Sequence, residues 1–97
     1  MTTPSALTSL TDALYRHGYG PLASGHGTLW PCDVARMGEL AAALRARSSW
    51  RLAAACEHLA AGLAATDAAL SLPLNASRAP HLQAAAVHYD AVVRLTR

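Results

Sequence analysis

With 97 residues and a formal net charge of +2, the chain suits one small domain and is too weakly charged to indicate a polyanionic partner. Its apolar half is mostly alanine and leucine, with no phenylalanine or isoleucine, and all eight of its basic residues are arginine. Two cysteines, no signal-like start and no long apolar run predict a soluble, cytoplasmic protein without a disulfide framework.

The chain opens with the signals of a helix over residues 4–17. Thr3 suits the capping position, and Pro4 suits the first helical position, where an amide hydrogen would have no helical partner. The apolar face that follows at helical spacing, and that we expect to pack inward, consists of Leu7, Leu10, Leu14 and His17. Gly18 is expected to end the helix.

Residues 18–31 are predicted to form a glycine-rich loop, which is long for a compact helical protein. Its side chains Tyr19, His26 and Trp30 are candidates for binding a partner or a ligand, because loops on small rigid scaffolds are common binding sites. In the alternative interpretation, which we favour, Trp30 and the loop leucines only cover the open end of the helices.

Two apolar stripes follow, between Pro31 and Pro73. The first contains Val34, Met37, Leu40, Ala41 and Leu44, and the second contains Leu52, Cys56, Leu59, Leu63, Thr66 and Leu70. At about 100° per residue, the step from Leu44 to Leu52 rotates the stripe by roughly 80°. One straight helix would therefore present two different faces.

We accordingly predict two helices, over residues 32–47 and 49–72, with a break at Ser48 and Ser49. The alternative is one continuous helix of about 63 Å, at about 1.5 Å per residue. Such a helix would require an elongated or multi-chain molecule.

Pro80 opens the last predicted helix, over residues 80–96. Its expected inner face consists of Leu82, Ala85, Ala86, Tyr89, Val92, Val93 and Thr96. The four segments together predict an all-α protein, a small four-helix bundle in which residues 1–97 form a single helical domain.

We expect no catalytic residue, cofactor or metal site. No histidine or cysteine has another His, Cys, Asp or Glu three or four residues away, so a metal could be held only between separate segments. Cys32 is the thiol with the best reason to be reactive, at a helix start and with His26 upstream as a base, but Asp33 beside it disfavours the thiolate. Cys56 is expected in the core.

Nucleic-acid binding is an alternative function. Two helices separated by a short break have the order of a helix-turn-helix, and Arg45, Arg47 and Arg51 surround the break, where phosphate contacts are expected. Two residues depart from that pattern, because Arg45 replaces the usual turn glycine and Arg51 takes a position that is normally buried.

The function we favour is a non-catalytic, alanine-rich module for protein–protein interaction. Alanine and glycine on helix faces, including Gly38 and Gly62, allow helices to approach closely. The core has few large side chains, so a second copy of the chain, or another helical protein, would supply additional burial. A homodimer is the expected assembly.

Overall fold

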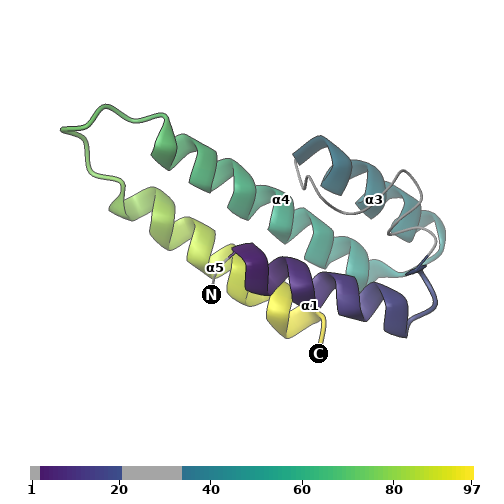
Figure 1. The fold of residues 1–97 in the computed structure, drawn as a ribbon. Coiled ribbons are helices and arrows are strands. Elements are labelled where there is room, and N and C mark those ends of the chain that lie inside the picture. Colours follow the sequence, from purple (N-terminus) through teal and green to yellow (C-terminus); the bar gives the residue numbers. More distant parts are fainter. Residues whose placement is uncertain (1–2, 21–33) are drawn as a thin grey trace.

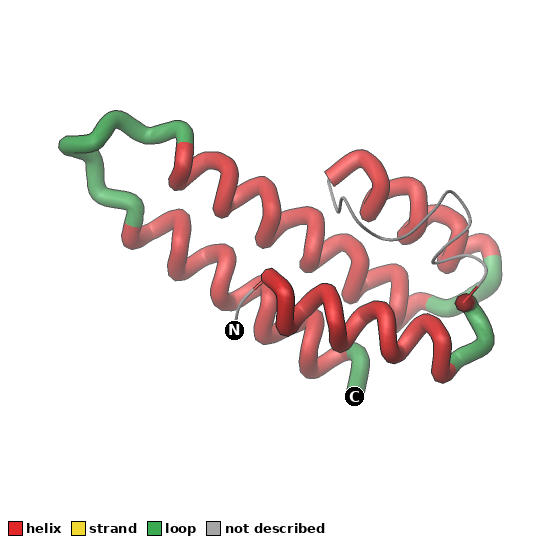
Figure 2. The backbone as a smooth tube through the Cα atoms, in the orientation of Figure 1, coloured by secondary structure: helices red, strands yellow, loops and turns green. Residues whose placement is uncertain are grey.

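The structure, a computed structural model, describes residues 3–20 and 34–97, and every regular element in that part of the chain is helical (Figures 1 and 2). The helices described are α1 (Thr3–Arg16), α3 (Val34–Ala46), α4 (Trp50–Leu70) and α5 (Ala79–Leu95). The predicted all-α bundle is thus confirmed, with each helix end within one or two residues of expectation.

Helices α4 and α5 form a long antiparallel hairpin, which is the backbone of the molecule (Figure 1). Helix α3 packs against α4, and α1 packs against both α4 and α5. The principal-axis extents are 46 × 25 × 20 Å, with a radius of gyration of 13.5 Å. A continuous helix of about 63 Å over residues 31–72 would exceed the longest of these extents.

The break between α3 and α4 is a Schellman motif. Ser48 has a left-handed backbone, with φ of 59°. Its amide donates to the carbonyl of Arg45 (2.9 Å), and the amide of Ser49 donates to that of Leu44 (2.9 Å). The predicted change of direction at Ser48 and Ser49 is therefore confirmed, although a glycine is the usual residue at a left-handed position.

Helix α1 ends in the same motif. Gly18 has φ of 83°, and its amide donates to the carbonyl of Tyr15 (3.1 Å). The amide of Tyr19 donates to the carbonyl of Leu14 (2.7 Å). The Tyr19 hydroxyl also hydrogen-bonds the Ser49 hydroxyl, so the ends of α1 and α3 are joined.

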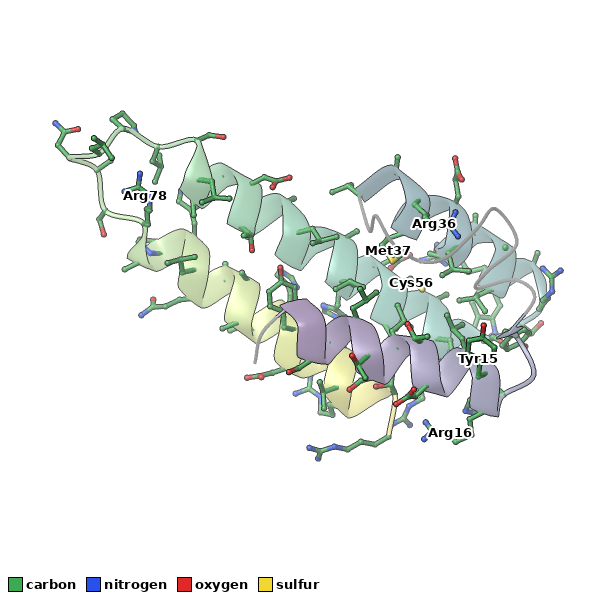
Figure 3. All side chains as sticks on the ribbon, viewed as in Figure 1. Tyr15, Arg16, Arg36, Met37, Cys56 and Arg78 are labelled. Carbon is green, nitrogen blue, oxygen red and sulfur yellow. The ribbon has the colours of Figure 1, made fainter. Side chains whose placement is uncertain are left out.

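All four helices contribute to one core. Its largest fully buried side chains are Leu10, Leu14, Met37, Leu44, Leu59, Val92 and Cys56. Met37 of α3 and Cys56 of α4, both labelled in Figure 3, belong to this core. Cys56 is buried and is not in a disulfide, in agreement with its predicted place in the core.

The C-terminal end of α5 is capped by arginines from the other helices. Arg51 of α4 donates from Nε to the carbonyl of Leu95 (2.8 Å) and from Nη2 to that of Arg94 (3.2 Å). Arg16 of α1 donates to the carbonyl of Thr96. Because the last carbonyls of a helix carry partial negative charge, these guanidinium groups stabilise the end of α5.

The expected inward faces are wrong at four positions. His17 lies beyond the end of α1 and is exposed, and Val34 is exposed in the first turn of α3. Leu70 and Leu82 have the expected helical phase, but both are exposed at the far end of the α4–α5 hairpin.

Candidate interaction surface

The α4–α5 hairpin is longer than the helices that pack on it. Helix α4 has 21 residues, whereas α1 has 14 and α3 has 13. In Figure 1 the end of the hairpin that carries the connection between α4 and α5 extends past both shorter helices. Figure 3 shows Arg78 at this projecting end, far from Met37, Cys56 and Arg16.

The apolar stripe of α4 runs past the helices that cover it. Leu52 and Leu59 are buried, and Leu63 is half-buried against the core. Leu70, the last residue of α4, lies 18 residues after Leu52, which is five turns at about 3.6 residues per turn, and so has the same phase. It is nevertheless 73% exposed.

Two further leucines are exposed at the same end of the hairpin. Leu82, in the first part of α5, is 50% exposed, and Leu74, in the connection between the helices, is 96% exposed. We refer to Leu70, Leu74 and Leu82 as the leucine tip. Large apolar side chains gathered at one projecting end are typical of an interaction site.

The connection between α4 and α5 has internal hydrogen bonds. Arg78 donates from Nη2 to the carbonyl of Leu72 (3.0 Å), and the amide of Ala76 donates to the carbonyl of Pro73 (3.0 Å). The Ser71 hydroxyl donates to the carbonyl of Asp67 (2.9 Å). These contacts define the backbone on which Leu74 is presented.

Charge is sparse over the projecting half of the hairpin. From residue 61 to residue 88 the chain contains one acidic residue, Asp67, and one arginine, Arg78. A strongly charged partner would therefore find little complementary charge here.

A glycine brings α4 and α5 together below the tip. A Cβ atom added at Gly62 would lie 2.4 Å from Cε1 of Tyr89, so the Tyr89 ring packs directly on the backbone of α4. The Tyr89 hydroxyl is 3.0 Å from Oγ1 of Thr66, which itself donates to the carbonyl of Gly62 (2.9 Å). The expected role of Gly62 in close helix approach is confirmed, whereas Gly38 is exposed and has no atom within 4 Å of such a Cβ.

The loop candidates for partner binding are not brought together by the described structure. Tyr19 is half-buried, with its hydroxyl bonded to Ser49 at the helix ends. His26 and Trp30, together with Cys32 and its thiol hypothesis, lie outside the described residues. A binding role for the loop over residues 18–31 stays a prediction.

The three arginines of the nucleic-acid alternative all have partners within the chain. Arg45 is ion-paired with Glu57, Arg47 donates from Nη1 to the carbonyl of Ala43 (3.0 Å), and Arg51 caps α5. Helices α3 and α4 run back along each other in Figure 1, as in an αα-hairpin. A nucleic-acid role for these arginines stays a prediction.

An open pocket of about 550 Å³ lies at the end of the molecule opposite the leucine tip. Its lining includes His17, Trp50, Arg51 and Arg97. Arg51 is held there by the carbonyls it caps, so part of the positive charge in this pocket already has a structural role.

The described residues contain no group of three or more His, Cys, Asp or Glu side chains placed to hold a metal ion. None of the described helices combines the length and the apolar character needed to span a bilayer. Comparisons of the chain with protein-family models, curated proteins and solved structures find no match.

The leucine tip is the feature that the predicted inner faces missed. The helical phase of Leu70 and Leu82 predicts that both lie in the core. Phase shows only which way a side chain points, however, and not whether another helix covers it. A signal was nevertheless present, since the predicted helix over residues 49–72 is about ten residues longer than the one over residues 4–17. At about 1.5 Å per residue, this difference leaves roughly 15 Å of helix uncovered.

Proposed function

We propose that this chain is a non-catalytic helical interaction module that self-associates through the leucine tip. The observation that carries the proposal is the exposure of Leu70, which continues the core stripe of α4 beyond the cover of α1 and α3. A partner that packs on this stripe would extend the core along the hairpin.

A second copy is the occupant that best fits the tip. The projecting half of the hairpin presents leucines and alanines, with one acid and one arginine between residues 61 and 88. This composition is self-complementary, because the apolar surfaces of two copies can pack on each other and each copy adds only one acidic residue and one arginine. Two hairpins related by a two-fold axis would pack as a four-helix bundle, the partner hairpin taking the place that α1 and α3 take at the other end.

The expected association is of moderate strength. Burying an exposed leucine side chain contributes about 1.5–3 kcal/mol, and a symmetric pair would bury six. The loss of translational and rotational freedom on association costs about 4–15 kcal/mol, which is of the same order. We therefore expect a monomer–dimer equilibrium that depends on protein concentration rather than an obligate dimer.

Sedimentation velocity over a series of protein concentrations tests the proposal. The wild-type chain is expected to shift from monomer to dimer as its concentration rises. The double variant Leu70→Gln with Leu82→Gln should stay monomeric, because glutamine keeps the side-chain length but not the apolar surface. Leu74→Gln, at a site 96% exposed and outside the helices, should weaken the dimer without affecting the fold.

Val87→Thr is the matched control. Val87 is 67% exposed on α5 but lies five residues from Leu82, about 140° around the helix, so it faces away from the tip. This variant should dimerise like the wild-type chain. A wild-type chain that remains monomeric at every concentration would overturn the proposal, as would tip variants that dimerise normally while circular dichroism shows them folded.

The nucleic-acid alternative predicts a different result in a parallel experiment. Binding of duplex DNA would weaken steeply with salt, and it would be lost when Arg47 and Arg51 are replaced by alanine. The self-association proposed here predicts no such salt dependence and no role for these arginines in forming the dimer.

A further inference from the structure

Two histidines from different helices meet on the α4–α5 hairpin. His58 of α4 and His88 of α5 are both half-buried, and their Nδ1 atoms are 3.0 Å apart. The ring centroids are 5.3 Å apart with an interplanar angle of 38°, so the rings meet through their nitrogen edges and are not stacked. One ring donates a hydrogen bond and the other accepts it.

The spacing of the two nitrogens is close to what a metal ion requires. Zinc binds histidine nitrogen at about 2.0–2.1 Å in tetrahedral geometry, which places two such nitrogens about 3.3–3.4 Å apart. The Nδ1 atoms at 3.0 Å would have to separate by only a few tenths of an ångström. The ring that donates the hydrogen bond would carry its proton on Nε2 instead of Nδ1. A turn of each imidazole about its side-chain bonds would then direct both Nδ1 lone pairs at one point.

The surroundings of His58 disfavour its protonated form. Burial lowers the pKa of His58 from its ordinary value of 6.5, and the neighbouring His88 and Arg94 lower it further. A neutral imidazole has a lone pair to offer a metal, whereas a protonated one has none. The positive charge of Arg94 near the pair acts against a bound cation, which limits the affinity of the site.

We propose that His58 and His88 bind one divalent transition-metal ion, with Zn²⁺ as the expected ion, through their Nδ1 atoms. Water would fill the remaining coordination positions, because the described residues provide no third ligand beside the pair. Spacing along a single helix could not reveal this site, because its ligands come from two helices and lie 30 residues apart.

The place of the pair on the hairpin gives the metal a structural effect. His58 lies one turn before Gly62 on α4, and His88 precedes Tyr89 on α5, so the pair flanks the close contact between the two helices. A metal bound there would link α4 to α5 at the base of the projecting half. Because the folded hairpin holds the two nitrogens close together and the unfolded chain does not, the metal would bind the folded state more tightly and raise the melting temperature.

Titration of the metal-free protein with ZnCl₂ by isothermal calorimetry, followed by thermal unfolding with and without zinc, tests the site. The wild-type chain is expected to bind one zinc ion per chain and to melt at a higher temperature in its presence. His58→Gln and His88→Gln should each weaken zinc binding by at least about tenfold. Removing a residue that only hydrogen-bonds a metal ligand already lowers metal affinity by about 10–100-fold, and these variants remove a ligand itself. Both variants should also lose the zinc-dependent rise in melting temperature.

His81→Gln is the matched control, because His81 is also a half-buried histidine of α5 but lies two turns before His88. It should bind zinc and gain thermal stability as the wild-type chain does. The proposal is overturned if the wild-type chain binds no zinc at millimolar concentration. It is also overturned if zinc binding survives unchanged in both His58→Gln and His88→Gln, which would locate the ion on other residues.

Discussion

Gly62 sets the distance between α4 and α5. The ring of Tyr89 occupies the space that a Cβ atom at position 62 would need, with Cε1 only 2.4 Å from that atom. Tyr89 is buried, and its hydroxyl is hydrogen-bonded to Thr66. The ring is therefore restrained by packing and by this hydrogen bond, and it has little room to move. A side chain at position 62 must therefore push the two helices apart.

We predict that Gly62→Ala destabilises the fold by up to about 2 kcal/mol. Overpacking a core usually costs about 1–3 kcal/mol. The helix propensity that alanine gains over glycine, about 1 kcal/mol, offsets part of that cost. Gly38→Ala is the control, because Gly38 is also helical but is exposed with open space around it. It should stabilise by up to about 1 kcal/mol. Urea unfolding followed by circular dichroism measures both, and a stabilising Gly62→Ala would contradict the packing described.

At the scale of the element, the turn at Ser48 decides the architecture. Its left-handed backbone ends α3 and lets α4 run back along it, where a continuous helix would not fit within the molecule. For a residue with a Cβ atom, this conformation costs about 1–2 kcal/mol. The cost is met by the two hydrogen bonds of the motif and by the core that the turn allows α3 and α4 to build.

Ser48→Gly is accordingly expected to stabilise the protein by up to about 1 kcal/mol, since glycine removes the left-handed cost but adds freedom to the unfolded chain. Ser49→Gly adds the same freedom to the unfolded chain but relieves no left-handed strain, because Ser49 has φ of −91°. It also removes the hydroxyl that is hydrogen-bonded to Tyr19. It should destabilise. Thermal melts of the two variants against the wild-type chain measure the difference, and a destabilising Ser48→Gly would show that the serine side chain itself stabilises the turn.

The pattern of apolar residues was sufficient to predict the helices and the break between them. A stripe fixes the phase of a helix, and the rotation between Leu44 and Leu52 has no explanation within one straight helix. The motif at Ser48 could not be predicted in this way, because serine is a poor match for a left-handed position. Gly18 takes the equivalent left-handed position at the end of α1. The sequence predicts that helix end because glycine is the usual residue at such a position.

Contacts between helices were the part that the sequence could not supply. The meeting of His58 with His88 depends on how far α4 and α5 slide along each other, and that register is fixed by the Gly62–Tyr89 contact. The exposure of Leu70 likewise depends on where α1 and α3 end in space and not on the phase of α4. Both features are properties of helix packing, which a pattern within one helix does not encode.

At the scale of the whole molecule, burial is uneven along the hairpin. The half of α4 that α1 and α3 cover carries most of the buried residues of this helix, from Leu52 to Leu59. The other half has Gly62 and Ala69 buried and ends at the exposed Leu70. Local unfolding costs least where few apolar contacts hold a helix. In a single chain, the last turns of α4 and the first turns of α5 should therefore open more readily than the rest of the hairpin.

Amide hydrogen exchange provides a measurement of this gradient. In dilute protein, we expect the amides of residues 66–70 and 82–85 to exchange faster than those of residues 52–59, because the covered half opens only with the core. Raising the protein concentration should slow exchange at the tip and leave the covered half nearly unchanged, since the partner hairpin would bury only the tip. In Leu70→Gln with Leu82→Gln, tip exchange should stay fast at every concentration. Uniform exchange along α4 would contradict the uneven burial, whereas a gradient that ignores concentration would contradict only the self-association.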